Sequence, residues 1–209
     1  TTSQPNVVSL HSTADPFQEP PTPPRSTIRA LLQAQHNPGL WDNLKCDGDG
    51  WWIADAIINR TLMMVSDGSY MSGRHAGACS CGFTLLCTKT RLQLKCSWAE
   101  LQTQSDNYRG ELLGAIGFLS VLRAVLSEPS VMERVRSAKT KPCPKGWSDN
   151  QGVLSHGNNP TRTLPKHQSH VDLVCVLREL VNTLPINVSF HHIPGHRDRH
   201  IPYRLLTLE

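Results

Sequence analysis

Apolar residues recur along the chain at two spacings, and each spacing is typical of one kind of secondary structure. Short apolar runs or strict alternation indicate strands, and they occupy residues 61–65, 78–88, 91–98 and 186–193. Apolar positions three or four residues apart indicate helices, and they occupy residues 26–37, 51–59, 105–126 and 169–183. Strands and helices in this mixed order predict an α/β fold.

The strand-like segments predict a five-stranded mixed sheet flanked by helices. The first three follow one another through tight links such as residues 88–90, so we expect an antiparallel meander. A very short fourth strand is expected at 146–148, because Pro142 and Pro144 exclude a longer central strand. This strand and 186–193 are the two expected parallel strands.

Residues 105–126 form the clearest helix pattern, with Ser105 as a candidate cap. The segment nevertheless contains Gly110, Gly114 and Gly117, each of which costs a helix about 1 kcal/mol relative to alanine. We expect these glycines to allow a close approach between the helix and the sheet.

Three regions are expected along the chain. Residues 1–25 are rich in Ser, Thr, Pro and Gln and have few clustered apolar residues, which predicts a disordered Pro-rich tail. Residues 26–60 are expected to be an N-terminal helical extension, and residues 61–209 the main domain.

Composition restricts the function classes only weakly. The 21 Lys and Arg outnumber the 17 Asp and Glu, and the net charge of +4 is compatible with a nucleic-acid partner. No apolar run reaches the roughly 20 residues of a membrane span, and no secretory signal pattern is present. The seven cysteines are odd in number and scattered, which favours reduced thiols. We therefore expect an intracellular protein, nuclear or cytoplasmic, that is not secreted and has no membrane partner.

Four short motifs follow one another between residues 66 and 198. They are Ser66-Asp67-Gly68-Ser69, Tyr108-Arg109-Gly110-Glu111-Leu112-Leu113, Ser148-Asp149-Asn150 and Pro194-Gly195-His196-Arg197-Asp198. From about residue 61 to its end, the chain resembles the ribonuclease H domain of retrotransposon-type reverse transcriptases. The resemblance implies a ribonuclease H-like fold.

The resemblance also implies a metal site. Asp67 would contact two Mg²⁺ ions, and Glu111 and Asp149 would each hold one, with Mn²⁺ as a substitute. Carboxylate oxygens suit such hard cations, and two cations can assist the attacking water and the leaving alkoxide of a phosphodiester. His196 would assist product release or proton transfer.

The implied activity is hydrolysis of the RNA strand of an RNA–DNA hybrid, next to the polymerase domain of a larger polyprotein. A protein of this kind recognises the hybrid by its shape and 2′-hydroxyls more than by its sequence. The residues expected to contact substrate are Ser69, Asn107, Arg109, Asn150 and Lys166.

The chain departs from the family pattern near its end. The family continues into a further helix that carries a fourth catalytic Asp, whereas this sequence stops at Glu209. The final helix is therefore expected to be missing, and activity to be reduced. Either the sequence is truncated, which we favour, or Asp198 replaces the fourth acid.

Three alternatives remain open at this point. The first is a degenerate, inactive ribonuclease H-like module that binds nucleic acid or protein. The second is an integrase, whose last acid would be Glu179 on the late helix. The third is zinc bound by His192, His196 and His200, or a metal pair at Cys79 and Cys81.

Overall fold

The computed structural model describes residues 26–34, 38–70, 77–102 and 105–195. Its strands are β1 (Lys45–Cys46), β2 (Leu62–Tyr70), β3 (Ala78–Cys87), β4 (Gln93–Leu101), β5 (Lys145–Ser148) and β6 (Ser189–His192). Its helices are α1 (Ile28–Gln33), α2 (Trp52–Ile58), α3 (Asn107–Leu126), α4 (Pro129–Arg136), α5 (Gln151–Asn158) and α6 (Val171–Thr183), with a 3-10 turn η1 (Pro38–Trp41).

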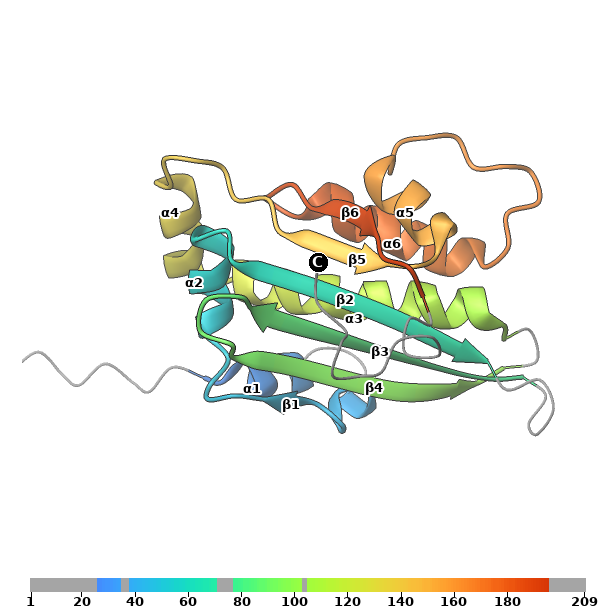
Figure 1. Ribbon diagram of the computed structural model, residues 1–209, viewed down its shortest axis with the longest axis horizontal. Helices are drawn as coiled ribbons and strands as arrows, with labels where there is room; N and C mark the ends of the chain where they lie inside the picture. The colour runs from blue at the N-terminus through green and yellow to red at the C-terminus, as the bar shows by residue number, and fades with distance from the viewer. Residues whose placement is uncertain (1–25, 35–37, 71–76, 103–104, 196–209) are drawn as a thin grey trace, which may run out of the picture.

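The strands form one sheet in the order β1-β4-β3-β2-β5-β6 (Figure 1). β2, β3 and β4 are antiparallel, and β5 and β6 continue the sheet in parallel from β2, as the sequence predicts. The sheet has six strands and not the expected five, because β1 pairs with β4. A two-residue strand is too short to leave an alternating pattern, so only its pairing reveals it.

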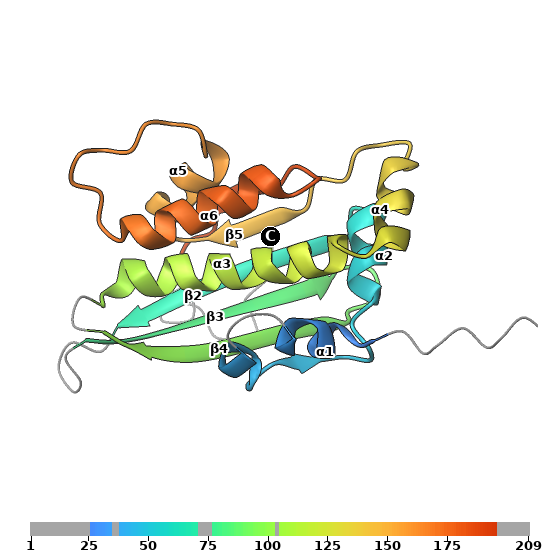
Figure 2. The ribbon, with the colours of Figure 1, turned by 180° about the vertical axis from the view of Figure 1, so that it is seen from behind.

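One face of the sheet is covered by helices. Figure 2 shows α3 lying over the sheet, with α1 and α6 on either side of it. The buried side chains between these layers include Phe118 and Leu122 of α3. Ile28 of α1 and Ile53 of α2 belong to the same hydrophobic core. Residues 26–60 thus pack with the rest of the chain, and the boundary at residue 61 stays a prediction.

The other face of the sheet is polar where β4 crosses it. Leu94 and Cys96 are buried, while Lys95 and Ser97 between and beyond them are exposed. This alternation of two is expected for a strand with one face on the core. Within the described chain, no helix covers β2, β3 and β4 on this side (Figure 1).

Strand ends differ in detail from the predicted ones. β2 continues to Tyr70, since each of its residues pairs with β3, so Asp67 lies within a strand and not at its end. β5 is as short as the prolines predict. The carbonyl of Pro144, just before β5, accepts a hydrogen bond from the Ser189 N–H at 3.1 Å, which is the bond a proline can still make.

The two long predicted helices are confirmed as α3 and α6. The cap of α3 is Asp106 and not Ser105, because the Asp106 carboxylate accepts a hydrogen bond from the Arg109 N–H at 2.8 Å. The sequence did not predict α4 and α5. Both have eight residues and contain residues that usually indicate a turn, Pro129 in α4 and Gly152 and Gly157 in α5.

The glycines of α3 allow the predicted close approach to the sheet. A Cβ atom at Gly114 would lie 2.9 Å from the carbonyl oxygen of Gly82 on β3, and one at Gly117 would lie 2.6 Å from the Phe83 ring. Neither distance is compatible with a real side chain. The missing Cβ atoms therefore set the distance between helix and sheet.

Some expectations fall on parts of the chain that the structure does not describe. The tail at 1–25, His196 and Asp198 all lie outside the described residues. Among the described helices, none is by itself long and apolar enough to cross a membrane. α3 and α4 reach that length and composition only together, across a 91° bend.

Gly114→Ala should lower the free energy of unfolding by roughly 1–3 kcal/mol, the usual cost of overpacking. Helix propensity alone predicts the opposite sign, a gain of about 1 kcal/mol. Urea denaturation measures the difference. The control is Gly82→Ala, whose Cβ would lie 3.6 Å from the nearest atom and should cost no stability. A gain of stability in Gly114→Ala would contradict the close approach.

Candidate metal centre

The register of β2 and β5 brings two of the acids together. Val65 and Trp147 are partners in this parallel pair, and Asp67 and Asp149 each lie two residues further along. Side chains two residues apart point to the same face of a sheet. β5 ends at Ser148, so the Asp149 carboxylate lies where the two strands separate.

The third acid comes from the first turns of α3. A Cβ atom at Gly110 would lie 2.7 Å from the Ser80 carbonyl oxygen and 3.2 Å from the Gly68 Cα. Gly68, directly after Asp67, would likewise collide with the backbone of Glu111 if it had a Cβ. Backbone contact between helix and strand therefore holds Glu111 beside Asp67.

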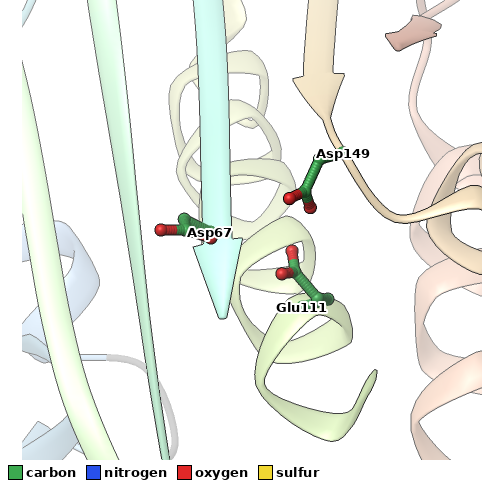
Figure 3. A group of neighbouring side chains, drawn as sticks. All are labelled: Asp67, Glu111 and Asp149. Carbon is green, nitrogen blue, oxygen red and sulfur yellow. The ribbon is translucent and has the colours of Figure 1, made fainter. Parts of the chain in front are cut away.

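The three carboxylates form one cluster, drawn in Figure 3. One carboxylate oxygen from each of Asp67, Glu111 and Asp149 lies within 4.8 Å of the other two. Asp67 is exposed and Asp149 is half-buried, while Glu111 is 1 % exposed. The cluster thus opens to solvent on the Asp67 side and is closed behind Glu111.

The donor atoms fit a divalent cation. Glu111 Oε2 is buried and has no hydrogen-bond partner among the described residues. A buried carboxylate oxygen without a partner is costly, since its lost hydration is not replaced. Three carboxylates are also the oxygen ligands that Mg²⁺ and Mn²⁺ prefer. A bound cation would supply the missing partner and offset the repulsion within the cluster.

Electrostatics in the cluster change the acidity of Glu111. Burial raises its pKa to about 8, the Gly68 N–H opposes the shift, and the charges of Asp149 and Asp67 add to it. At neutral pH the cation-free carboxyl is therefore protonated. A cation must displace that proton, so cation affinity is expected to rise with pH up to about pH 8.

Glu111→Gln should stabilise the cation-free protein at alkaline pH. The folded-state pKa lies above the unfolded value, so the wild type loses stability as pH rises from about 4.5 to about 8, while the variant does not. In EDTA at pH 9, we expect its Tm to be roughly 5 °C or more above that of the wild type, and near it at pH 4.5. Thermal scans at both pH values test this, with the exposed Glu179→Gln as control. A lower Tm for Glu111→Gln at pH 9 would contradict the buried charge.

The fourth motif returns to the same place. After β6, the Ile193 N–H donates to the Ser148 carbonyl at 3.2 Å, and a Cβ at Gly195 would overlap the Asp149 carboxylate. The described part of the fourth motif, Pro194-Gly195, thus lies beside the acid of the third motif.

Three features decide the fold type: an antiparallel meander continued by two parallel strands, a long helix packed on the meander, and acids on the first strand, this helix and the fourth strand. The fold is ribonuclease H-like. The added strand β1 lies at the far edge of the sheet from this common arrangement.

Sequence comparison alone does not assign this chain to a family. No family model matches it, and no curated protein is significantly similar to it. Solved ribonuclease H structures are similar to it at low identity. A ribonuclease H1 isolated from compost is 15% identical, with a TM-score of 0.48 over 67% of this chain and 89% of its own.

Two further structures are similar at the same level. The compost enzyme in complex with an RNA/DNA hybrid is 11% identical, with a TM-score of 0.46 over 66% of this chain and 89% of that one. The protease-reverse transcriptase of prototype foamy virus is 13% identical, with a TM-score of 0.45 over 69% of this chain and 19% of that one. Similarity this low carries no functional argument, and the assignment of the fold depends on the topology and the acids.

The expected substrate residues lie in different environments. Ser69, Asn107 and Lys166 are exposed. The side chain of Asn150 caps α5 by accepting from the Gly152 and Val153 N–H groups, at 2.9 and 3.2 Å. Four of the five residues therefore keep at least part of their surface accessible.

Arg109 differs from this expectation, because its side chain is only 7% exposed and is fully engaged. The guanidinium donates to Glu100 at 2.6 and 2.9 Å and to Asp172 at 3.2 Å. These contacts join α3 to β4 and α6. The neighbouring Asp106–His170 pair, 2.9 Å apart, joins the same two helix ends. No sequence signal identified Glu100 and Asp172 as partners of Arg109. Asp106 could have been predicted as the helix cap, because it lies three residues before Arg109.

Arg109→Gln should destabilise the fold by roughly 2–4 kcal/mol, since it leaves the partly buried Glu100 without its oppositely charged partner. Chemical denaturation measures the loss. Arg134→Gln is the matched control, because Arg134 pairs with Asp55 on the surface, where both side chains are at least half exposed. That change should cost less than about 1 kcal/mol. Equal losses of unfolding free energy in the two variants would show that the ion pairs of Arg109 stabilise the fold no more than a surface ion pair does.

The alternative metal sites find no support in the described residues. Glu179 is exposed on α6 and does not join Asp67, whereas Glu111 does, which is the reverse of the integrase arrangement. Cys79 and Cys81 are buried on β3 and face Glu100 and the Trp98 carbonyl of β4, as packed strand cysteines do. Of the three histidines, His196 and His200 lie outside the described residues.

Proposed function

We propose that this protein is a metal-dependent endonuclease that hydrolyses the RNA strand of RNA–DNA hybrids. The observation that carries the proposal is the acidic cluster, in which three carboxylates from separate elements converge within 4.8 Å. Such a cluster is repulsive without a ligand, and the buried Glu111 oxygen lacks a partner. The ribonuclease H-like fold supports the choice of substrate.

The proposed roles are those that the family resemblance implies. Asp67, the exposed member, would contact both cations, while Glu111 and Asp149 would each hold one. Bound there, Mg²⁺ or Mn²⁺ would supply positive charge for the attacking water and the leaving alkoxide of the phosphodiester. Asp67 and Asp149 would orient the cations from the sheet edge, and Glu111 would fix them from behind. His196 would assist product release or proton transfer.

The accessible polar residues around the cluster suit a nucleic-acid substrate. Ser69 and Asn107 would contact the hybrid beside Asp67, and Asn150 and Lys166 beside Asp149. We further propose that the chain works next to the polymerase domain of a retroelement reverse transcriptase, inside the cell. The net charge of +4 favours association with nucleic acid in general.

The second candidate is a degenerate module of the same fold that binds nucleic acid without cleaving it. The observation that favours it is the pKa of Glu111, which burial raises to about 8, because a carboxyl that keeps its proton at neutral pH binds a cation less well. The two candidates share the cluster and differ in whether it supports catalysis.

Incubation of a labelled RNA–DNA hybrid with the protein and Mg²⁺ or Mn²⁺ should give RNA fragments on a denaturing gel. Asp67→Asn, Glu111→Gln and Asp149→Asn should each lower the rate at least about 100-fold, since each removes a charge that acts on the transition state. Glu179→Gln is the control, because it removes an exposed acid outside the cluster and should leave the rate unchanged.

Two results would redirect the assignment. A wild type as inert as Asp67→Asn, yet able to bind the hybrid, would favour the degenerate module. Cleavage that survives loss of all three carboxylates would indicate a contaminating nuclease and remove the basis of the proposal.

A further inference from the structure

The polar face of the sheet is hollowed beside Asp67. A groove of about 530 Å³ begins at Asp67 and runs across β3 and β4 to β1. Its lining includes Asn43, Lys45, Gly82, Lys95 and Ser97. Gly82 lies directly opposite Asp67 on β3, so no side chain blocks the groove where it leaves the cluster. The hollow and the metal centre are therefore continuous.

The strand register places two lysines at the far end of this groove. Val65 pairs with Thr84, Thr84 with Lys95, and Lys95 with Lys45, so these residues form one row across four strands. Neighbouring strands are about 4.8 Å apart, so Lys95 lies roughly 10 Å and Lys45 roughly 15 Å from β2. These spacings suit successive phosphates of a nucleic-acid strand.

The two lysines are not explained by the stability of the fold. Lys45 and Lys95 are direct partners on antiparallel strands, and like charges in that position destabilise a sheet. Both side chains are exposed, and neither forms an ion pair within the described part of the chain. Among the described residues that line the groove, Asp67 is the only acidic one. A polyanion in the groove would relieve the repulsion between the lysines.

We propose that this groove holds the sugar-phosphate backbone of one strand of the nucleic acid bound at the metal centre, with Lys45 and Lys95 contacting its phosphates. The inference rests on the proposed function, because it takes nucleic acid as the ligand of that centre. Lys ammonium groups at the far end provide charge, and the Thr84 and Ser97 hydroxyls can donate to phosphate oxygens. Continuity with the acidic cluster favours nucleic acid over an acidic protein.

The proposal gives residues 26–60 a role in binding. Asn43 and Lys45 belong to this segment, which precedes the region of family resemblance. Asn43 Nδ2 donates to the Ser97 carbonyl at 3.1 Å, and this bond ties the segment to β4 next to the groove. Strand β1 thereby extends the polar face of the sheet by one strand and adds a positive charge to it.

The double variant Lys45→Gln/Lys95→Gln tests the proposal. Binding of a fluorescent RNA–DNA hybrid is measured by anisotropy in EDTA, which prevents cleavage, over a range of salt concentrations. Two lost phosphate contacts should weaken binding on the order of tenfold and reduce the slope of log K against log salt by about 1.5. The Tm of the variant should be unchanged or higher, because a repulsion is removed, whereas lysines with a structural role would lower it.

Two variants serve as controls. Lys139→Gln/Lys141→Gln removes two exposed charges in the connection between α4 and β5, outside the groove, and should change affinity less than twofold. Lys45→Arg/Lys95→Arg keeps the charge and should bind like the wild type. Equal affinities of the two Gln double variants would overturn the proposal. Competition by polyglutamate that depends on Lys45 and Lys95, without such dependence for the hybrid, would overturn it in favour of an acidic protein.

Failure of this inference is distinguishable from failure of the proposed function. If the protein cleaves the hybrid with metal but the groove lysines do not affect binding, only the groove assignment fails. If the lysines govern binding but no cleavage occurs, the groove assignment stands and the endonuclease proposal fails.

Discussion

Helix α3 lies in close backbone contact with the sheet, and this contact determines the position of the acidic cluster. Gly68 on β2 and Gly110 and Gly114 on α3 lack the Cβ atoms that would separate the two layers. Each helical glycine costs about 1 kcal/mol in propensity, and burial of the apolar side of α3 offsets that cost. The contact also holds Glu111 beside Asp67, so the packing of the core and the geometry of the acidic cluster have one cause.

Two groups of acidic side chains differ in how their charge is stabilised. Around Arg109, the carboxylates of Glu100 and Asp172 receive hydrogen bonds from the guanidinium, and the ion pairs fasten α3 to its neighbours. In the acidic cluster, Glu111 is more deeply buried and one of its oxygens has no partner. The fold thus stabilises the first group through ion pairs within the chain, whereas the second group could hold a cation.

The two faces of the sheet differ in polarity. One face carries the helices and the hydrophobic core, and the other is polar, with the acidic cluster at the edge where β2 and β5 diverge. Strand β1 lies on the opposite side of the meander and widens the polar face. Its lysine stands opposite another lysine, an arrangement that the stability of the sheet does not require.

Local spacing and short motifs were enough to predict the order of the main elements, the mixed sheet, the close approach of α3 and the three acids. These features do not depend on distant partners. The burial of Glu111, the structural role of Arg109 and the pairing of β1 could not be predicted in this way. Each of these depends on residues far along the chain, such as Asp172 for Arg109 and Lys95 for Lys45. Burial and strand pairing arise when segments far apart in the sequence come into contact. The local pattern of one segment does not indicate which other segment it will contact.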